Sequence, residues 1–219
     1  AFMGWLFESN VPAGVPRLLL VAAATLPWTF FSTAFSEAAN SLITNSNLLT
    51  KVYFPRLIVP ASTIIVCLID FAISLAIVLV LMLVYRFTPD IHILLLPLFL
   101  LLALITALGS GLLIAALNVK YRDFRYIVPF IVQFGLYVSP IAFSSSDIQT
   151  NDRIPEVVKW IYSLNPMVGV IDGFRWCLLG GQTTLQAQGF LVSVGISLLM
   201  LLVGIRYFRS TEKTFADVI

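Results

Sequence analysis

Few side chains in this chain could do chemistry within its apolar stretches. Asp70 is the only charged residue deep in a predicted membrane span, and His92 is the only histidine. No two carboxylates, and no nucleophile and base, are spaced so that the two groups would meet. Cys67 and Cys177 fit neither a disulfide framework nor a metal-ligand spacing, which favours a role in apolar packing. The sequence therefore predicts no catalytic residue and no metal site.

Two readings of Asp70 stay open. An acid in a membrane span is expensive and usually faces a cavity or the interior of a helix bundle, so Asp70 is a candidate functional residue. A structural hydrogen bond to a neighbouring helix is the alternative. His92 stands beside Asp90 at a predicted span boundary, which indicates an interfacial residue. No glycine-rich motif for holding ATP phosphates is present, so we expect no cofactor in this chain.

The composition is that of an integral membrane protein. Of 219 residues, 59% are hydrophobic and 11% are charged, whereas soluble domains carry about 25% charged residues. A net charge of +2, with basic residues scattered between apolar stretches, excludes nucleic-acid binding. We expect one all-α transmembrane domain over residues 1–219 with spans at about 18–39, 57–85, 93–117, 127–143 and 185–205.

A sixth span is expected in part at the start of the chain. The apolar run 1–7 is too short to cross a bilayer and does not begin with Met, so we expect an amino-terminal part to be missing. The span at 127–143 contains Pro129, Gln133 and Pro140, which predicts an irregular or bent helix.

The distribution of Lys and Arg predicts the orientation of the spans. One set of connections, including links 41–56 and 118–126, carries eight basic residues: Lys51, Arg56, Lys120, Arg122, Arg125, Arg206, Arg209 and Lys213. The other set carries five: Arg17, Arg86, Arg153, Lys159 and Arg175. Because basic residues favour the inner side, we expect the first set and the carboxyl terminus to be cytoplasmic.

Two short helices are predicted within residues 154–180, on the outer side. Val157, Trp160, Ile161 and Leu164 form an amphipathic stripe. Asn165 and Pro166 are typical of a helix start, and Gly180 and Gly181 of a helix stop. We interpret this pair as re-entrant or interfacial helices that gate an exit, and the alternative is a cap that only packs on the bundle. The candidate gate residues are Trp160, Asn165, Pro166, Phe174 and Arg175.

Aromatic side chains recur along two of the spans. Most aromatic residues in membrane spans pack or form interfacial belts, while a minority line pathways. Sugars stack well on aromatic faces, so an aromatic-lined channel would suit a polysaccharide that must slide. The candidate lining residues, with Asp70, are Trp28, Phe31, Phe35, Phe134 and Tyr137.

Several separated motifs, in order along nearly the whole chain, resemble one family. They are residues 26–32, 47–56 (Asn47 to Arg56), 118–126, Ser139–Pro140, 164–167, 173–175 and the tail 211–219. Together they resemble the membrane subunit of polysaccharide ABC exporters, the permeases for lipid-linked O-antigen, capsule and teichoic acid. The tail is similar to the O-antigen branch. The chain departs from the family at the front, where an amphipathic helix and a complete first span are absent.

The resemblance implies a homodimer of six-span subunits that encloses a channel, in the bacterial inner membrane. It implies two ATP-binding-cassette ATPase subunits, which would hold ATP and Mg, and an undecaprenyl-pyrophosphate-linked polysaccharide as substrate. The link near Lys51 corresponds to a coupling helix that docks on the ATPase, and the residues expected to couple are Lys51, Tyr53, Phe54, Arg56, Arg122 and Arg125. The alternatives are a permease for a drug or small lipid, an ion-coupled carrier or channel, and a structural membrane scaffold.

Overall fold

In the computed structural model, the regular elements are helical throughout the described residues. These residues are 15–46, 55–121, 123–141, 143, 145, 148, 154–181, 183 and 185–212. The α-helices are α2 (Arg17–Thr44), α4 (Ile58–Val84), α5 (Leu96–Lys120), α6 (Phe124–Val138), α8 (Glu156–Ser163), α9 (Pro166–Leu178) and α10 (Ala187–Thr211), and a 3-10 helix, η1 (Ile91–Leu95), leads into α5. The predicted all-helical fold is confirmed for this part of the chain. Lys51, Tyr53, Phe54 and Arg122 lie outside the described residues.

Four of the described helical segments are long and apolar enough to cross a membrane. They are α2, α4, the continuous segment Ile91–Lys120 and α10. The shorter α6 has 15 residues, which at 1.5 Å per residue is about 22 Å, less than the roughly 30 Å of a bilayer core. The regular helix is therefore shorter than the irregular or bent span expected over 127–143. The helix begins earlier and ends at Val138, because Ser139 precedes Pro140 and is extended (φ −87°, ψ 149°).

The first long helix continues further than its apolar stretch predicted. Polar side chains in its last turns hydrogen-bond to the helix's own carbonyl oxygens: Asn40 donates to Ser36 (2.9 Å) and Ser41 to Ala38 (2.7 Å). This satisfies polar groups that would otherwise need water. As a result α2 runs to Thr44, and the predicted link 41–56 is shorter than expected by its first four residues.

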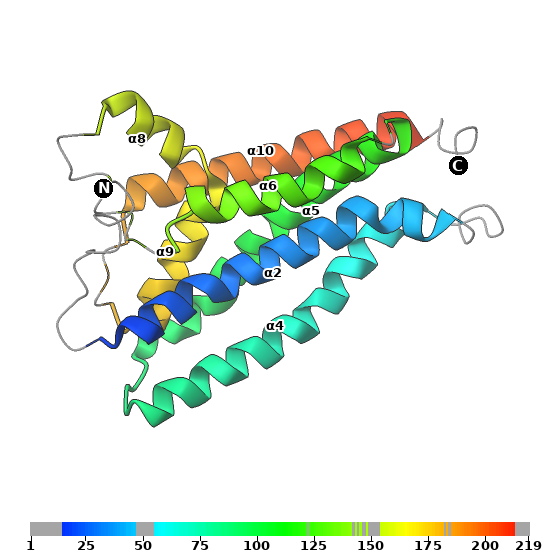
Figure 1. The fold of residues 1–219 in the computed structure, drawn as a ribbon. Coiled ribbons are helices and arrows are strands. Elements are labelled where there is room, and N and C mark those ends of the chain that lie inside the picture. Colours follow the sequence, from blue (N-terminus) through cyan, green and yellow to red (C-terminus); the bar gives the residue numbers. More distant parts are fainter. Residues whose placement is uncertain are drawn as a thin grey trace.

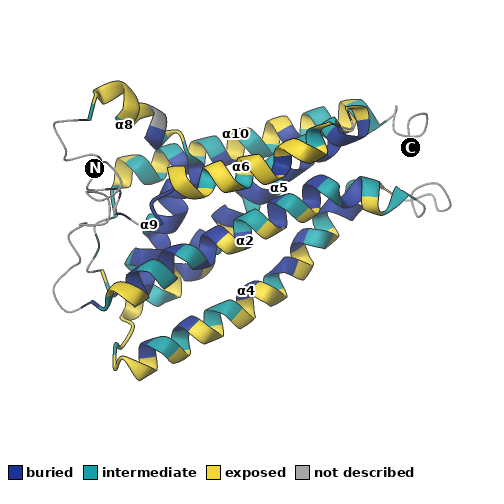
Figure 2. Ribbon diagram, viewed as in Figure 1, coloured by how far each residue is buried: buried dark blue, intermediate teal, exposed yellow. Residues whose placement is uncertain are grey.

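The helices form one bundle with α2 at its centre (Figure 1). The central helix packs against α4, α5, α6 and α9, and α5 also packs against α10. Figure 2 shows the consequence for burial: α9 and much of α2 and α5 are buried, whereas α4 and α6 are largely exposed. The exposed residues of α4 are mostly aliphatic, as expected for a helix that faces lipid.

Small residues allow the closest helix contacts. A Cβ on Gly204 of α10 would lie 2.2 Å from the carbonyl oxygen of Gly109 on α5. One turn away, the hydroxyls of Thr106 and Ser197 hydrogen-bond at 2.8 Å across the same interface. Such small and hydroxyl-bearing residues bring helix backbones together where lipid provides no hydrophobic driving force. The α5–α10 pair is therefore a rigid part of the bundle.

Because the long helices run from one end of the bundle to the other, the connections between them lie at two opposite ends (Figure 1). One end, here called the basic end, holds Arg56, Lys120, Arg125 and Arg209, next to the ends or starts of α2, α4, α5, α6 and α10. The other end, here called the α9 end, holds α8, α9, and the starts of α2 and α10. The described members of the two sets of basic residues that the sequence separated thus lie at opposite ends.

Candidate functional site

At the α9 end, α9 starts and stops where the sequence predicted. The Asn165 side chain caps the helix by accepting a hydrogen bond from the backbone N–H of Met167 (3.0 Å), and Pro166 takes the first helical position. After Leu178 the chain passes through Gly180 and Gly181 with φ of +62° and +74°, a conformation that favours glycine. Both predicted boundaries are confirmed.

The sequence Gly173-Phe174 seats α9 among the long helices. A Cβ on Gly173 would lie 2.0 Å from the Phe99 ring of α5, so the glycine is what allows the two helices to meet there. The next residue, Phe174, is fully buried and its ring lies edge-on to Phe71 of α4 (centroids 5.9 Å apart). Two neighbouring residues therefore connect α9 to two different long helices.

Arg175, the third residue of this motif, is almost completely buried, with 2% of its surface exposed. Its guanidinium donates hydrogen bonds to the carbonyl oxygens of Phe143 (2.8 Å), Ile141 (2.8 Å) and Leu20 (3.4 Å). A guanidinium presents five N–H donors in a fixed fork, which suits several fixed carbonyl acceptors. Arg175 thus ties α9 to α2 and to the chain after α6, and this side chain is not free to meet a substrate.

Asp172 lies three residues before Arg175 on the same helix. Burial raises the pKa of the Asp172 carboxyl from its usual value near 3.8 to about 6, although a hydrogen bond with Ser145 and the nearby Arg175 guanidinium act to lower it. The sequence analysis did not select this residue. An acid three positions before a basic residue on one helix was the signal that could have identified it.

α8 lies beside the start of α10 with its apolar stripe outward. Val157, Trp160 and Leu164 are exposed, Trp160 by 69%. On the same helix, Lys159 and Glu156 form an ion pair at 3.0 Å. The predicted helix is confirmed, and the three described residues of its apolar stripe, Val157, Trp160 and Leu164, are exposed in the isolated chain.

α6 carries an aromatic stripe that faces away from the rest of the chain. Tyr126, Phe130, Phe134 and Tyr137 recur at helical spacing and are between 61% and 73% exposed. On the opposite face, Val128 is buried against α2. These four residues are here called the α6 aromatic stripe. Two of them, Phe134 and Tyr137, are candidate lining residues from the sequence.

The other aromatic candidates lie on α2 and form a ladder. The ring of Phe31 contacts Trp28 (centroids 5.6 Å apart) and stacks on Phe35 (5.8 Å). Trp28 and Phe35 are buried within the chain's own helices, whereas Phe31 is half-buried. A Cβ on Gly135 of α6 would lie 2.6 Å from the Trp28 indole, so Trp28 is covered directly by α6. These rings of α2 therefore pack against the face of α6 that is opposite its aromatic stripe.

Asp70 is not brought together with these aromatic residues. It lies on α4, is exposed in the isolated chain, and α4 and α6 lie on opposite sides of α2 (Figure 1). The exposed carboxylate distinguishes neither the functional nor the structural reading of this residue. Near the α9 end, His92 lies 3.2 Å from Asp90 and against the Trp176 ring. Within the described part of the chain, no three His, Cys, Asp or Glu side chains are grouped as a metal site would require.

At the basic end, Arg56 is half-buried and donates a hydrogen bond to the carbonyl oxygen of Glu212, the residue after α10. A cation is favourable there because the last carbonyl groups of a helix carry partial negative charge. Arg125 is exposed at the start of α6, and the Lys120 ammonium lies over the Tyr121 ring (5.2 Å to the centroid). Arg56 therefore holds two helix ends together, while Arg125 presents its charge outward.

Comparison with known proteins identifies the family of this chain and several similar relatives. Residues 2–179 match the family described as ABC-2 type transporter. The chain is 29% identical over 212 residues to the O-antigen export system permease protein RfbA of Myxococcus xanthus, covering 97% of this chain and 78% of the relative. It is 26% identical over 217 residues to RfbA of Klebsiella pneumoniae, covering 98% of this chain and 81% of the relative. The chain belongs to the ABC-2 type transporter family.

Proposed function

We propose that this chain is the permease subunit of an ATP-driven exporter that moves a lipid-linked, O-antigen-like polysaccharide across the bacterial inner membrane. The single observation that carries the proposal is the similarity to O-antigen export permeases over nearly the whole chain. Membership of a family of membrane transport subunits agrees with four helices that are long enough to span a bilayer.

In the proposed assembly, two copies of the chain form a homodimer around the transport path. The α6 aromatic stripe supports this arrangement, because four aromatic side chains exposed in the isolated chain offer a surface for a partner or a substrate. Aromatic faces stack on sugar rings without binding one position strongly. A second copy facing the stripe would enclose a path on which an undecaprenyl-pyrophosphate-linked polymer could slide.

ATP hydrolysis would come from two ATPase subunits bound at the basic end, which then lies in the cytoplasm with the carboxyl terminus. Arg125 supports this because it is exposed at that end, while Arg56 would act as a positioning residue through its bond to Glu212. Lys51, Tyr53 and Phe54 lie between α2 and α4 in the sequence, and they are proposed to contribute to coupling as well.

The test is deletion of the gene followed by analysis of lipid-linked glycan. We expect surface polysaccharide to disappear and lipid-linked polymer to accumulate on the cytoplasmic leaflet. The wild-type gene should restore export, and the double variant Lys51→Glu with Arg125→Glu should not, despite normal membrane levels. Arg86→Glu, a charge reversal at the exposed α9 end, is the matched control and should restore export. Unchanged surface polysaccharide in the deletion strain would refute the polymer and would favour export of a drug or small lipid.

A further inference from the structure

A groove lies between α8 and the start of α10 at the α9 end. Its volume is about 460 Å³, within the range of roughly 300–1,000 Å³ that is usual for small-molecule sites. α8 contributes Lys159 and Trp160 to its wall, α10 contributes Gln188 and Gly189, and Gln186 lies just before α10. Ser163 lines both this groove and a small neighbouring cavity.

The lining combines apolar surface with neutral polar groups and one ion pair, and it carries no net charge. Lys159 is paired with Glu156 at 3.0 Å, and the two glutamine side chains each offer an acceptor oxygen and two donor hydrogens. Trp160 adds a broad apolar face, 69% exposed. An aromatic face beside neutral donors and acceptors suits a sugar, which has apolar C–H faces and a rim of hydroxyl groups. A phosphate group would instead need an unpaired cation, and Lys159, the one cation among the residues that line the groove, is already paired.

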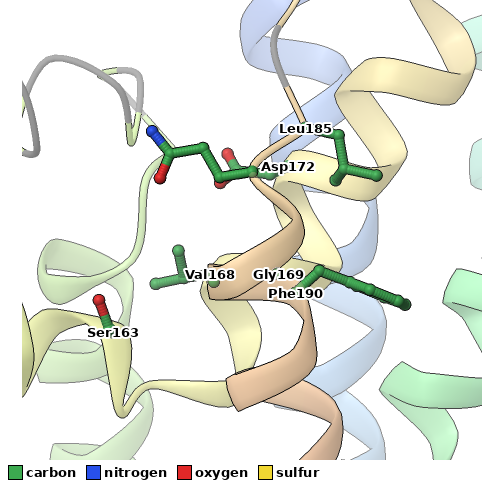
Figure 3. Close-up of a pocket in the computed structure, with 8 residues that line it drawn as sticks. Ser163, Val168, Gly169, Asp172, Leu185 and Phe190 are labelled. Carbon is green, nitrogen blue, oxygen red and sulfur yellow. The ribbon is translucent and has the colours of Figure 1, made fainter.

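A small cavity of about 10 Å³, whose lining residues are drawn in Figure 3, adjoins the groove. It shares Ser163, Gln186 and Gly189 with the groove and reaches Asp172 on α9. This volume is sufficient for about one water molecule. This cavity offers the Asp172 carboxyl, which also hydrogen-bonds with Ser145, and the Ser163 hydroxyl, which donates to the Lys159 carbonyl oxygen (2.9 Å). Both retain acceptor lone pairs for a water that bridges to a sugar in the groove.

We propose that this groove binds a short stretch of neutral glycan, as an exit subsite for the exported polymer. The proposal rests on the proposed function for its biological role, because that function places the α9 end outside the membrane. In this role the groove would hold the emerging chain by Trp160 stacking and by hydrogen bonds from the α10 glutamines.

Two glycines of α10 provide a matched pair of variants. At Gly189, in the groove, and at Gly195, two turns away, an added Cβ would meet no atom within 4 Å. The Cβ of a larger side chain therefore meets no neighbour at either position, but only a side chain at residue 189 starts in the groove. Both substitutions also remove a helical glycine, so their effects on helix stability are similar.

The test measures binding of lipid-free oligosaccharide, released by mild acid from the surface polymer of the same bacterium, to the full-length permease in nanodiscs. We expect Gly189→Trp and Trp160→Ala to weaken binding by at least about tenfold, with Gly195→Trp equal to wild type. Thermal unfolding midpoints equal to that of wild type would show that the variants are folded.

Wild-type affinity in both groove variants, or no binding to the wild-type protein, would overturn the proposal. Binding of glycerol 3-phosphate in place of the oligosaccharide, with the same dependence on Gly189, would overturn the glycan class and indicate a lipid headgroup site. The two proposals can be refuted independently. Unchanged surface polysaccharide in the deletion strain would refute the proposed function, whereas the binding measurement tests whether the groove binds glycan.

Discussion

The indole of Trp28 on α2 lies directly against Gly135 of α6, where a Cβ would come within 2.6 Å of the ring. This contact fixes how closely α6, with its outward aromatic stripe, approaches the central helix. Only a few contacts hold α6 to the bundle, and Val128 is its one residue fully buried among those described. The position of the stripe therefore depends strongly on the space left by one glycine.

We predict that Gly135→Val moves α6 away from α2 and reduces export. Overpacking of this kind costs about 1–3 kcal/mol of stability. Surface polysaccharide and the thermal unfolding midpoint in detergent are the measurements. Adding Trp28→Phe, which removes ring atoms at the contact, should restore both. Gly195→Val is the control, because a Cβ there meets no neighbour. Equal behaviour of the Gly135 and Gly195 variants would contradict the role of the contact.

A second prediction concerns the α5–α10 interface. Gly204→Ala places a methyl group against the carbonyl oxygen of Gly109. A backbone carbonyl cannot rotate away, so the helices must separate and the Thr106–Ser197 hydrogen bond must lengthen or break. We expect a loss of about 1–3 kcal/mol, seen as a lower unfolding midpoint. Gly195→Ala should leave the midpoint unchanged or raise it slightly, and a wild-type midpoint for Gly204→Ala would refute this packing.

A third prediction concerns Arg175. Replacement by leucine leaves the carbonyl oxygens of Ile141 and Phe143 without their donor and removes the cation beside Asp172. Unsatisfied buried polar groups cost about 1–3 kcal/mol each, so Arg175→Leu should accumulate poorly or unfold at a clearly lower temperature. Adding Asp172→Asn should recover part of the loss. If the single and double variants unfold at the same temperature, the two side chains are not coupled.

The fourth prediction is a dependence of stability on pH. The pKa of Asp172 is higher in the folded protein, about 6, than its usual value of 3.8, so the folded state binds this proton more tightly. The ionised carboxylate is therefore a penalty above pH 6, and the penalty is relieved as the pH falls from about 7 to about 4. We expect a relative stabilisation on the order of 2 kcal/mol, which Asp172→Asn should lack. Parallel pH profiles of wild type and variant would refute it.

The fifth prediction separates the transport path from stability. Phe134 and Tyr137 are 68% and 61% exposed, so alanine at both positions should leave the unfolding midpoint of the isolated subunit nearly unchanged. Export should fall if these rings face the polymer. Leu136→Ala, on the same helix but off the aromatic stripe, is the control and should export normally. Loss of dimer in the double variant, shown by its mass in detergent, would assign the rings to subunit contact instead.

Sequence patterns predicted the helices that are governed by local rules. The apolar stretch near 57–85 is matched by α4, and the boundaries of α9 follow from Asn165, Pro166 and the two glycines, because capping and backbone conformation depend on a few neighbouring residues. The regular helix ends at Val138, five residues before the end of the span expected at 127–143. The apolar side chains continue beyond Val138, but Pro140 keeps Ser139 out of the helix.

The partners of individual side chains depended on the tertiary arrangement and were not predictable in this way. Trp28 and Phe134 are both aromatic residues of apolar stretches, yet Trp28 is buried under α6 and Phe134 is exposed on α6 itself. Arg175 had the sequence character of a surface gate residue, whereas its guanidinium is buried among three carbonyl groups from other segments. Such partners come from residues more than 30 positions away along the chain.

The hydrogen bond from Arg56 to the carbonyl oxygen of Glu212 connects the start of α4 to the end of α10, so α10 can transmit a displacement along its axis. At the basic end the carbonyl of Glu212 receives Arg56, and 19 residues earlier the Ser193 hydroxyl receives the N–H of Gly169 on α9 (3.1 Å), a separation of about 28 Å along the helix. A displacement of the start of α4 along the axis of α10 would therefore reach α9 at the opposite end of the bundle.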